Sequence, residues 1–145
     1  MIERIEIQYF RSIYQMKIRD IESINVITGK NDAGKSNILK ALNLFFNNCI
    51  AEPGDFVFKE NYNLKRLEEV RKDTIKGKQF IQIKTTFARG NQFEKTLPEH
   101  FTVTKKWNRD SDIPQVSDNL EYTLKRKGRK CTNSNKASLT KYMNK

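Results

Sequence analysis

Residues 29–36 read Gly-Lys-Asn-Asp-Ala-Gly-Lys-Ser, a complete match to the phosphate-binding pattern G-x-x-x-x-G-K-[ST]. The glycines Gly29 and Gly34 let the backbone turn tightly and bring several N–H groups close to an anion. The Lys35 ammonium is the expected partner of the β- and γ-phosphates, and the Ser36 hydroxyl is the expected ligand of Mg²⁺. The octet therefore predicts a binding site for a nucleotide and its metal ion.

Such a loop needs a strand before it and a helix after it. Ile24-Asn25-Val26-Ile27 is a short β-branched run beside Gly29, which is typical of a buried strand that leads into a tight turn. After the loop, apolar residues recur at helical spacing and predict a helix over residues 35–48, with its positive dipole end at the phosphates. The predicted apolar face of this helix consists of Ile38, Ala41, Leu42, Phe45, Phe46 and Cys49.

Length and composition favour one folded domain. The chain has 145 residues, of which 37% are hydrophobic and 31% charged. It contains no apolar run of about eighteen residues that could span a membrane, and residues 1–6 lack the apolar core of a secretion signal. With Cys49 and Cys131 far apart and a single histidine, we expect neither a disulfide framework nor a metal motif. The expected compartment is the cytoplasm.

The net charge of +11 is concentrated in the second part of the chain. Residues 51–145 carry twenty-one basic and twelve acidic side chains, and residues 122–145 carry no acidic one. A basic run can neutralise nucleic-acid phosphates, but it can equally be a solvated tail, and both interpretations stay open. The predicted nucleic-acid contacts are Lys125, Arg126, Lys127, Arg129 and Lys130.

Alternating apolar and polar residues predict further strands. Two strands, over residues 5–9 and 14–18, precede the loop and are joined by a short turn. A short charged helix is predicted over residues 63–72. Three half-exposed antiparallel strands follow, at residues 81–87, 101–107 and 120–124. We therefore expect an α/β P-loop NTPase core with an antiparallel β-lobe over residues 1–124, followed by a basic polar tail over 125–145.

The first 48 residues resemble the N-terminal lobe of the ABC-type ATPases of the SMC and RecF group. The similarity is greatest to the OLD-family ATPase–nucleases of bacterial antiphage defence. It rests on Tyr9-Phe10-Arg11-Ser12 at the end of the first strand and on residues 24–37, with Asn31 at the third loop position and Asn37 after the serine.

The resemblance implies a DNA-associated ATPase that binds ATP with Mg²⁺ and acts with a second copy or a second lobe. It also implies that Arg11 and Ser12 lie near the nucleotide, although Arg11 reads equally well as a surface turn residue. The nucleotide-binding residues expected on this basis are Arg11, Ser12, Gly29, Asn31, Asp32, Ala33, Gly34, Lys35, Ser36 and Asn37, with Ser36 at the metal.

Several elements that this group needs for hydrolysis are not found in the sequence. These are an apolar strand ending in Asp-Glu, a Ser-Gly-Gly signature segment, a catalytic glutamine loop and the acidic cluster of an attached nuclease. His100 has a turn-like setting and reads as a surface residue. We therefore assign no catalytic residue, and we expect a first lobe that is incomplete for hydrolysis alone and prone to associate.

Three alternatives differ in chemistry. A GTPase would need Asn-Lys-x-Asp, and the segment at residues 135–138 lacks the aspartate. A small-molecule kinase would normally continue with helices and parallel strands, whereas the alternating strands after residue 79 favour an antiparallel lobe. The third alternative is a remnant that binds nucleic acid or a partner through its basic half and leaves the loop unused.

Overall fold

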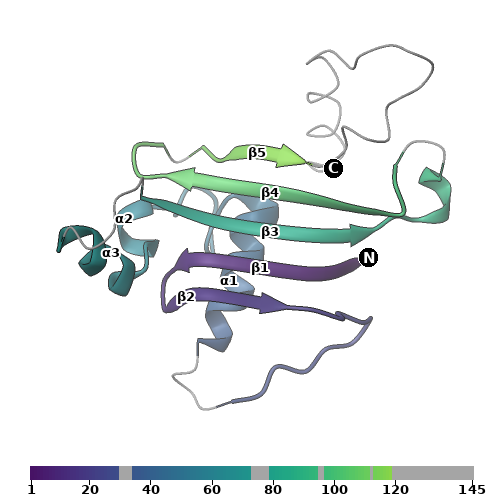
Figure 1. Ribbon diagram of the computed structural model, residues 1–145, viewed down its shortest axis with the longest axis horizontal. Coiled ribbons are helices and arrows are strands. Elements are labelled where there is room, and N and C mark those ends of the chain that lie inside the picture. Colours follow the sequence, from purple (N-terminus) through teal and green to yellow (C-terminus); the bar gives the residue numbers. More distant parts are fainter. Residues whose placement is uncertain (30–33, 73–78, 95–96, 112, 119–145) are drawn as a thin grey trace, which may run out of the picture.

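The computed structural model describes residues 1–29, 34–72, 79–94, 97–111 and 113–118. Within these residues an antiparallel sheet has the strand order β2-β1-β3-β4-β5, and helix α1 lies behind one face of it (Figure 1). The strands are β1 (Ile2–Phe10), β2 (Ile13–Ile18), β3 (Phe80–Ala88), β4 (His100–Asn108) and β5 (Gln115–Asp118). The helices are α1 (Lys35–Asn47), α2 (Phe58–Asn61) and α3 (Leu64–Arg71), and a 3₁₀ turn covers Asn91–Phe93. No helix in these ranges is long and apolar enough to cross a membrane.

The core lies between α1 and the face of the sheet that the alternating apolar residues form. Side chains on this face of the sheet include Ile5, Ile7, Ile81, Ile83, Val103 and Trp107, all of them buried. Against them α1 buries Ile38, Ala41, Leu44 and Phe45. Each fully buried side chain of this size contributes about 1.5–3 kcal/mol to folding, so this contact dominates the stability of the fold.

The predicted apolar face of α1 is partly wrong. Leu44, which was not predicted, is fully buried, whereas Phe46 is 37% exposed. The helix rests on the sheet along the line through Ala41 and Phe45, so that Leu44 turns inward and Phe46 lies at the margin. There the Phe46 ring packs edge-on against Phe87 of β3, with ring centroids 6.3 Å apart.

Most of the predicted strands and the charged helix are confirmed. β1 and β2 form an antiparallel hairpin in which Ile5 pairs with Ile18. β3 pairs antiparallel with both β1 and β4. α3 begins after Asn63, whose side chain accepts a hydrogen bond from the Arg66 N–H. β5 was missed because Val116 is its only apolar residue, and the predicted strand at 120–124 lies outside the described residues.

The predicted strand at residues 24–27 is wrong. After β2 the chain leaves the edge of the sheet, and Ile24 and Val26 are 83% and 81% exposed. The Asn25 side chain closes a local turn by donating to the Glu22 carbonyl at 2.7 Å. A β-branched run becomes a strand only when another strand pairs with it, and no described strand lies beside this one.

The C-terminal end of α1 is fixed to β4 by two side chains. Lys105 donates to the Phe45 carbonyl at 2.6 Å, and the Trp107 indole N–H donates to Asn48 Oδ1 at 2.9 Å. Burial lowers the pKa of the Lys105 ammonium. Asn48 ends the helix in the left-handed conformation, with φ 55°. Strand β4 therefore satisfies polar groups that the helix end would otherwise leave unpaired.

We expect Trp107→Phe to lower the free energy of unfolding by about 1–3 kcal/mol, because it removes the indole donor and leaves a cavity in the core. Urea denaturation followed by far-UV circular dichroism measures the change. Asn48→Gly is the matched control, since it keeps the left-handed helix end and removes only the acceptor. Equal stability of Trp107→Phe and the unmodified protein would show that this anchor contributes nothing.

Candidate nucleotide-binding site

The predicted loop leads directly into α1. Gly29 and Gly34 both have positive φ angles, 151° and 79°, which side-chain-bearing residues rarely adopt. The helix begins at Lys35, as predicted, with no side-chain cap and no acidic residue in its first turn. Its first N–H groups and positive dipole end are therefore suited to an anion. The predicted site residues Asn31, Asp32 and Ala33 lie outside the described part of the chain.

The turn between β1 and β2 lies against the start of α1. A Cβ atom placed on Gly34 would come within 2.8 Å of Ser12 Oγ, and the Asn37 side-chain amide donates to the same oxygen at 2.8 Å. The structure thus brings together three of the predicted site residues, Ser12, Gly34 and Asn37. Glycine is required at position 34 both for the backbone angle and for this close approach.

The backbone of Arg11 is held in place by the segment before α3. Its N–H donates to the Asn61 carbonyl at 2.7 Å, and its carbonyl accepts from the Asn63 side chain at 2.6 Å. Tyr9 and Arg11 both have left-handed φ angles, 58° and 50°, so the turn between β1 and β2 is strained. Asn61 and Asn63, which fix it, were missed because no sequence pattern links them to residue 11.

Within the described part of the chain, the Arg11 guanidinium has an unpaired nitrogen atom that could bind an anion. Its Nη1 atom is buried and has no hydrogen-bond partner among the described residues. A buried charged donor without an acceptor is costly, and a phosphate oxygen would satisfy it. The burial of this nitrogen distinguishes Arg11 from a fully solvated turn residue, and its nucleotide-binding role stays a prediction.

Lys35 and Ser36 supply the charge and the hydroxyl of the loop. The Lys35 ammonium donates to the Gly29 carbonyl and so spans the loop, while Ser36 is exposed at the helix start. Bound phosphate would replace this carbonyl as the partner of the ammonium. The residues described here include no group of three or more His, Cys, Asp or Glu side chains that could hold a metal. The predicted Mg²⁺ ligand among the described residues is the Ser36 hydroxyl, which would act together with phosphate oxygens and water.

Two other predicted features lie away from the loop. His100 approaches Glu3 at 2.7 Å on the surface with its side chain 56% exposed, which agrees with its reading as a surface residue. The basic run at Lys125–Lys130 lies outside the described residues, so the structure does not place it.

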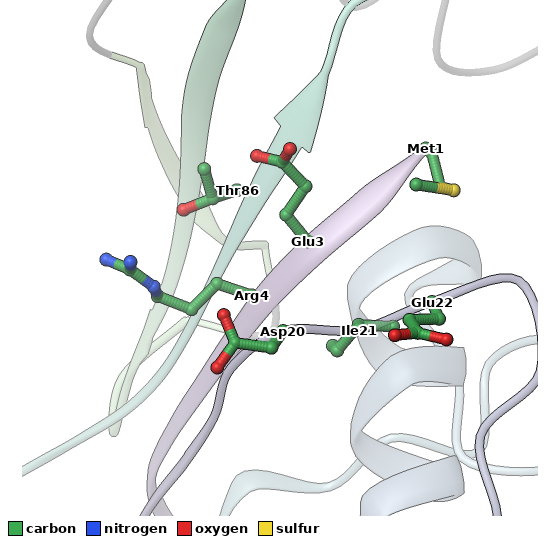
Figure 2. A pocket seen from close by; sticks show the side chains of 7 residues that line it. All are labelled: Met1, Glu3, Arg4, Asp20, Ile21, Glu22 and Thr86. Carbon is green, nitrogen blue, oxygen red and sulfur yellow. The ribbon is translucent and has the colours of Figure 1, made fainter.

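A hollow of about 370 Å³ lies between the start of β1 and the segment that follows β2. It is lined by Met1, Glu3, Arg4, Asp20, Ile21, Glu22 and Thr86. Figure 2 shows the carboxylates of Glu3, Asp20 and Glu22 pointing in different directions rather than at a common point. The hollow contains none of the predicted nucleotide-binding residues and is separate from the candidate site.

We expect Gly34→Ala to destabilise the fold by about 2 kcal/mol or more, because the new Cβ meets Ser12 Oγ and the backbone is left-handed. Gly54→Ala is the matched control: φ is +83° there with no atom within 4 Å of the added Cβ, so it measures the backbone strain alone. Thermal unfolding compares the two variants. Ser12→Ala should relieve part of the Gly34→Ala cost, and equal losses for both glycine variants would contradict the close contact.

The chain is similar to several known proteins. The chain is 29% identical to an ATP/GTP phosphatase of Helicobacter pylori over 138 residues, which cover 87% of this chain and 37% of that protein. It spans 20%, 28% and 37% of the lengths of the curated relatives that it matches.

Two solved structures share the fold. The recombination mediator RecF with ATP has a TM-score of 0.58 at 15% identity, covering 82% of this chain and 26% of that one. A structure of SMC ATPases has a TM-score of 0.58 at 17% identity, and the match covers 98% of this chain and 78% of that one. The predicted fold class, a P-loop NTPase lobe with an antiparallel sheet, is thereby confirmed. The model of the AAA ATPase domain matches residues 1–145, so the chain belongs to the AAA ATPase domain family.

Proposed function

We propose that this chain is the ATP-binding lobe of a DNA-associated ATPase, in an OLD-like, ATP-regulated nuclease of antiphage defence or DNA repair. The observation that carries the proposal is the junction of Ser12, Gly34 and Asn37 at the start of α1. It joins the turn between β1 and β2 to the phosphate loop. In addition, the Nη1 atom of Arg11, the residue that precedes Ser12 in this turn, is buried and has no partner among the described residues.

The roles proposed for the loop follow from its chemistry. Lys35 would neutralise the β- and γ-phosphates of ATP, and Ser36 would ligate Mg²⁺. The first-turn N–H groups of α1 would bind phosphate oxygens without reorganising. Bound Mg²⁺ would supply further charge neutralisation on the triphosphate. The chain contributes binding and positioning, and we assign the attacking water and its activation to residues that it does not contain.

The proposal includes a second protein layer, from a partner lobe or subunit, that covers the exposed side of α1. Leu39, on the side of α1 that faces away from the sheet, is 64% exposed, and the apolar segment before the loop is exposed as well. Exposed apolar surface of this kind on consecutive elements is typical of an interface. It supports a partner lobe or subunit that covers α1 and pairs with residues 24–27.

The proposed association with DNA and the proposed dimerisation are based on the descriptions of the two solved structures. The SMC structure is described as that of ATPases with ATP-driven dimerization and DNA-stimulated activation, and RecF is described as a recombination mediator. Transferred to this chain, these descriptions suggest that ATP brings two heads together and controls an activity on DNA. The net charge of +11 is consistent with an acidic partner.

A second candidate function is a non-enzymatic module that binds nucleic acid or a partner and leaves the loop unused. The exposed, unpaired segment at residues 24–27 favours it, since a phosphate loop normally follows a buried strand. ATP binding separates the two candidates, because only the first requires the loop to hold a nucleotide.

We expect a fluorescent ATP analogue to bind in the presence of Mg²⁺, and Lys35→Ala to raise its Kd by about tenfold or more, since the variant loses the phosphate-binding ammonium. Lys40→Ala, one turn further along α1, is the matched control and should leave the Kd unchanged. Fluorescence anisotropy measures both. If the folded protein does not bind the analogue, the ATP-binding proposal fails and the non-enzymatic candidate gains support.

We also expect the isolated chain to self-associate through its exposed apolar segments. Val26→Lys combined with Leu39→Lys should reduce association, because charges on this surface oppose apolar contact. Val57→Lys combined with Val116→Lys changes two exposed valines elsewhere and is the control. Sedimentation velocity at several protein concentrations measures the mass. A monomer at all concentrations would contradict the proposal that a second protein layer covers this surface.

A further inference from the structure

We propose that the face of the sheet opposite α1, at its end beside α3, binds the phosphate backbone of a nucleic acid through Lys65 and Lys106. This inference rests on the DNA association proposed above and names the surface that makes it. The observation behind it is a row of aromatic side chains, each with a cation over its ring.

No described element covers this second face of the sheet, which lies toward the viewer in Figure 1. Its side chains alternate with the buried ones and, away from the end beside α3, are mostly polar. They include Arg4, Glu6, Lys84, Thr86, Thr104 and Lys106. A shallow hollow of about 380 Å³ lies among them, lined also by the carboxylates of Glu6 and Asp118, and the Thr86 and Thr102 hydroxyls in it are 3.0 Å apart. Hydroxyl and cationic groups of this kind are the usual partners of phosphate oxygens.

At one end of this face three aromatic rings touch in sequence. The Tyr9 ring meets the rings of Tyr14 and Phe80 edge-on, with both centroid distances at 5.2 Å. The cation of Lys65 lies 5.1 Å from the Tyr14 ring centre and that of Lys106 lies 4.2 Å from the Phe80 ring centre. Energetically significant pairs of this type occur about once per 70–80 residues, so their concentration in one row is unusual.

The middle cation of the row has a structural role. The Arg66 guanidinium lies 4.8 Å from the Tyr9 ring centre, and the residue is only 8% exposed. It pairs with Glu69 at 3.4 Å, and Glu69 also accepts the Tyr14 hydroxyl at 2.8 Å. That hydrogen bond raises the pKa of the Tyr14 hydroxyl. Arg66 and Glu69 therefore fix the rings, and the outer two cations remain at the surface.

The outer cations, Lys65 and Lys106, differ from the other lysines of this face because no carboxylate among the described residues pairs with them. Glu6 binds Lys17 at 2.8 Å and approaches Lys84 at 3.9 Å, so one carboxylate serves both lysines. Burial opposes its ionisation, yet these two cations together with Arg4 lower the pKa of Glu6. No carboxylate forms an ion pair with Lys65 or Lys106 among the residues that the structure describes. A neutral ring positions each of these two cations and leaves its charge available to a phosphate.

The position of the row relates it to the nucleotide loop. Tyr9 and Tyr14 flank the turn that carries Arg11 and Ser12, and Ser12 touches Gly34 at the start of α1. The proposed phosphate contacts are thus attached to the same short turn as the candidate ATP site. Rings between flexible cations are also a sequence-tolerant arrangement, because every nucleotide carries the same phosphate and a flat base.

The test is fluorescence anisotropy of the full chain with a fluorescein-labelled DNA strand of about 30 nucleotides, alone and annealed to its complement, between about 50 and 200 mM salt. We expect Lys65→Gln combined with Lys106→Gln to raise the Kd by about tenfold at low salt. The magnitude of the log–log salt slope should fall by about 1.5–2, because two phosphate contacts are lost. Comparing the two probes shows whether single strands or duplexes are preferred.

Lys40→Gln combined with Lys59→Gln removes the same charge from α1 and α2 and should change the Kd by less than about twofold. Binding by the unmodified chain that the Lys65/Lys106 variant retains in full would overturn the inference and leave the proposed DNA association intact. Equal losses in both variants would also overturn it, because net charge alone would then explain binding. If the unmodified chain binds neither probe, the DNA association itself fails, whatever the outcome for ATP.

Discussion

The packing of α1 on one face of the antiparallel sheet is the contact on which the rest of this structure depends. Ala41, Leu44 and Phe45 are fully buried in it, and both ends of the helix are fixed by the strands. At the N-terminal end the turn after β1 touches Gly34, and at the C-terminal end β4 reaches the last turn through Lys105 and Trp107. These contacts hold both ends of the helix against the sheet, so the end of the loop at Gly34 has a defined position.

The two sides of this layer have opposite chemistry. Exposed apolar side chains occur on α1, at Leu39, and in the segment before the loop, at Val26, and such surface favours a protein partner. The uncovered face of the sheet is polar, with cations arranged over aromatic rings, and such surface favours an anion. A thin lobe with these two surfaces is suited to lie between a second protein layer and a charged ligand, with the nucleotide loop at its edge.

Local pattern was sufficient where a single element carries its own signal. The alternation in β1, β3 and β4 and the helical spacing after residue 35 predicted these elements, since each buries one face. Prediction from local pattern failed where strand formation depended on pairing with another strand. Residues 24–27 have β-branched side chains but no described strand beside them, and β5 has little apolar character yet pairs with β4. Strand formation is a property of pairs, so a single run of sequence does not determine it.

The sequence by itself determined which chemistry to expect at the candidate site, because Gly29, Gly34, Lys35 and Ser36 stand at a spacing that suits a phosphate. Only the tertiary structure decided which distant residues join them. Asn61 and Asn63 hold the Arg11 backbone across about fifty residues of chain, and the row of rings combines β1, β2, α3 and β3. The reason is physical: hydrogen bonds and ring contacts act through space over a few ångströms, so they follow the packing and leave no period in the sequence.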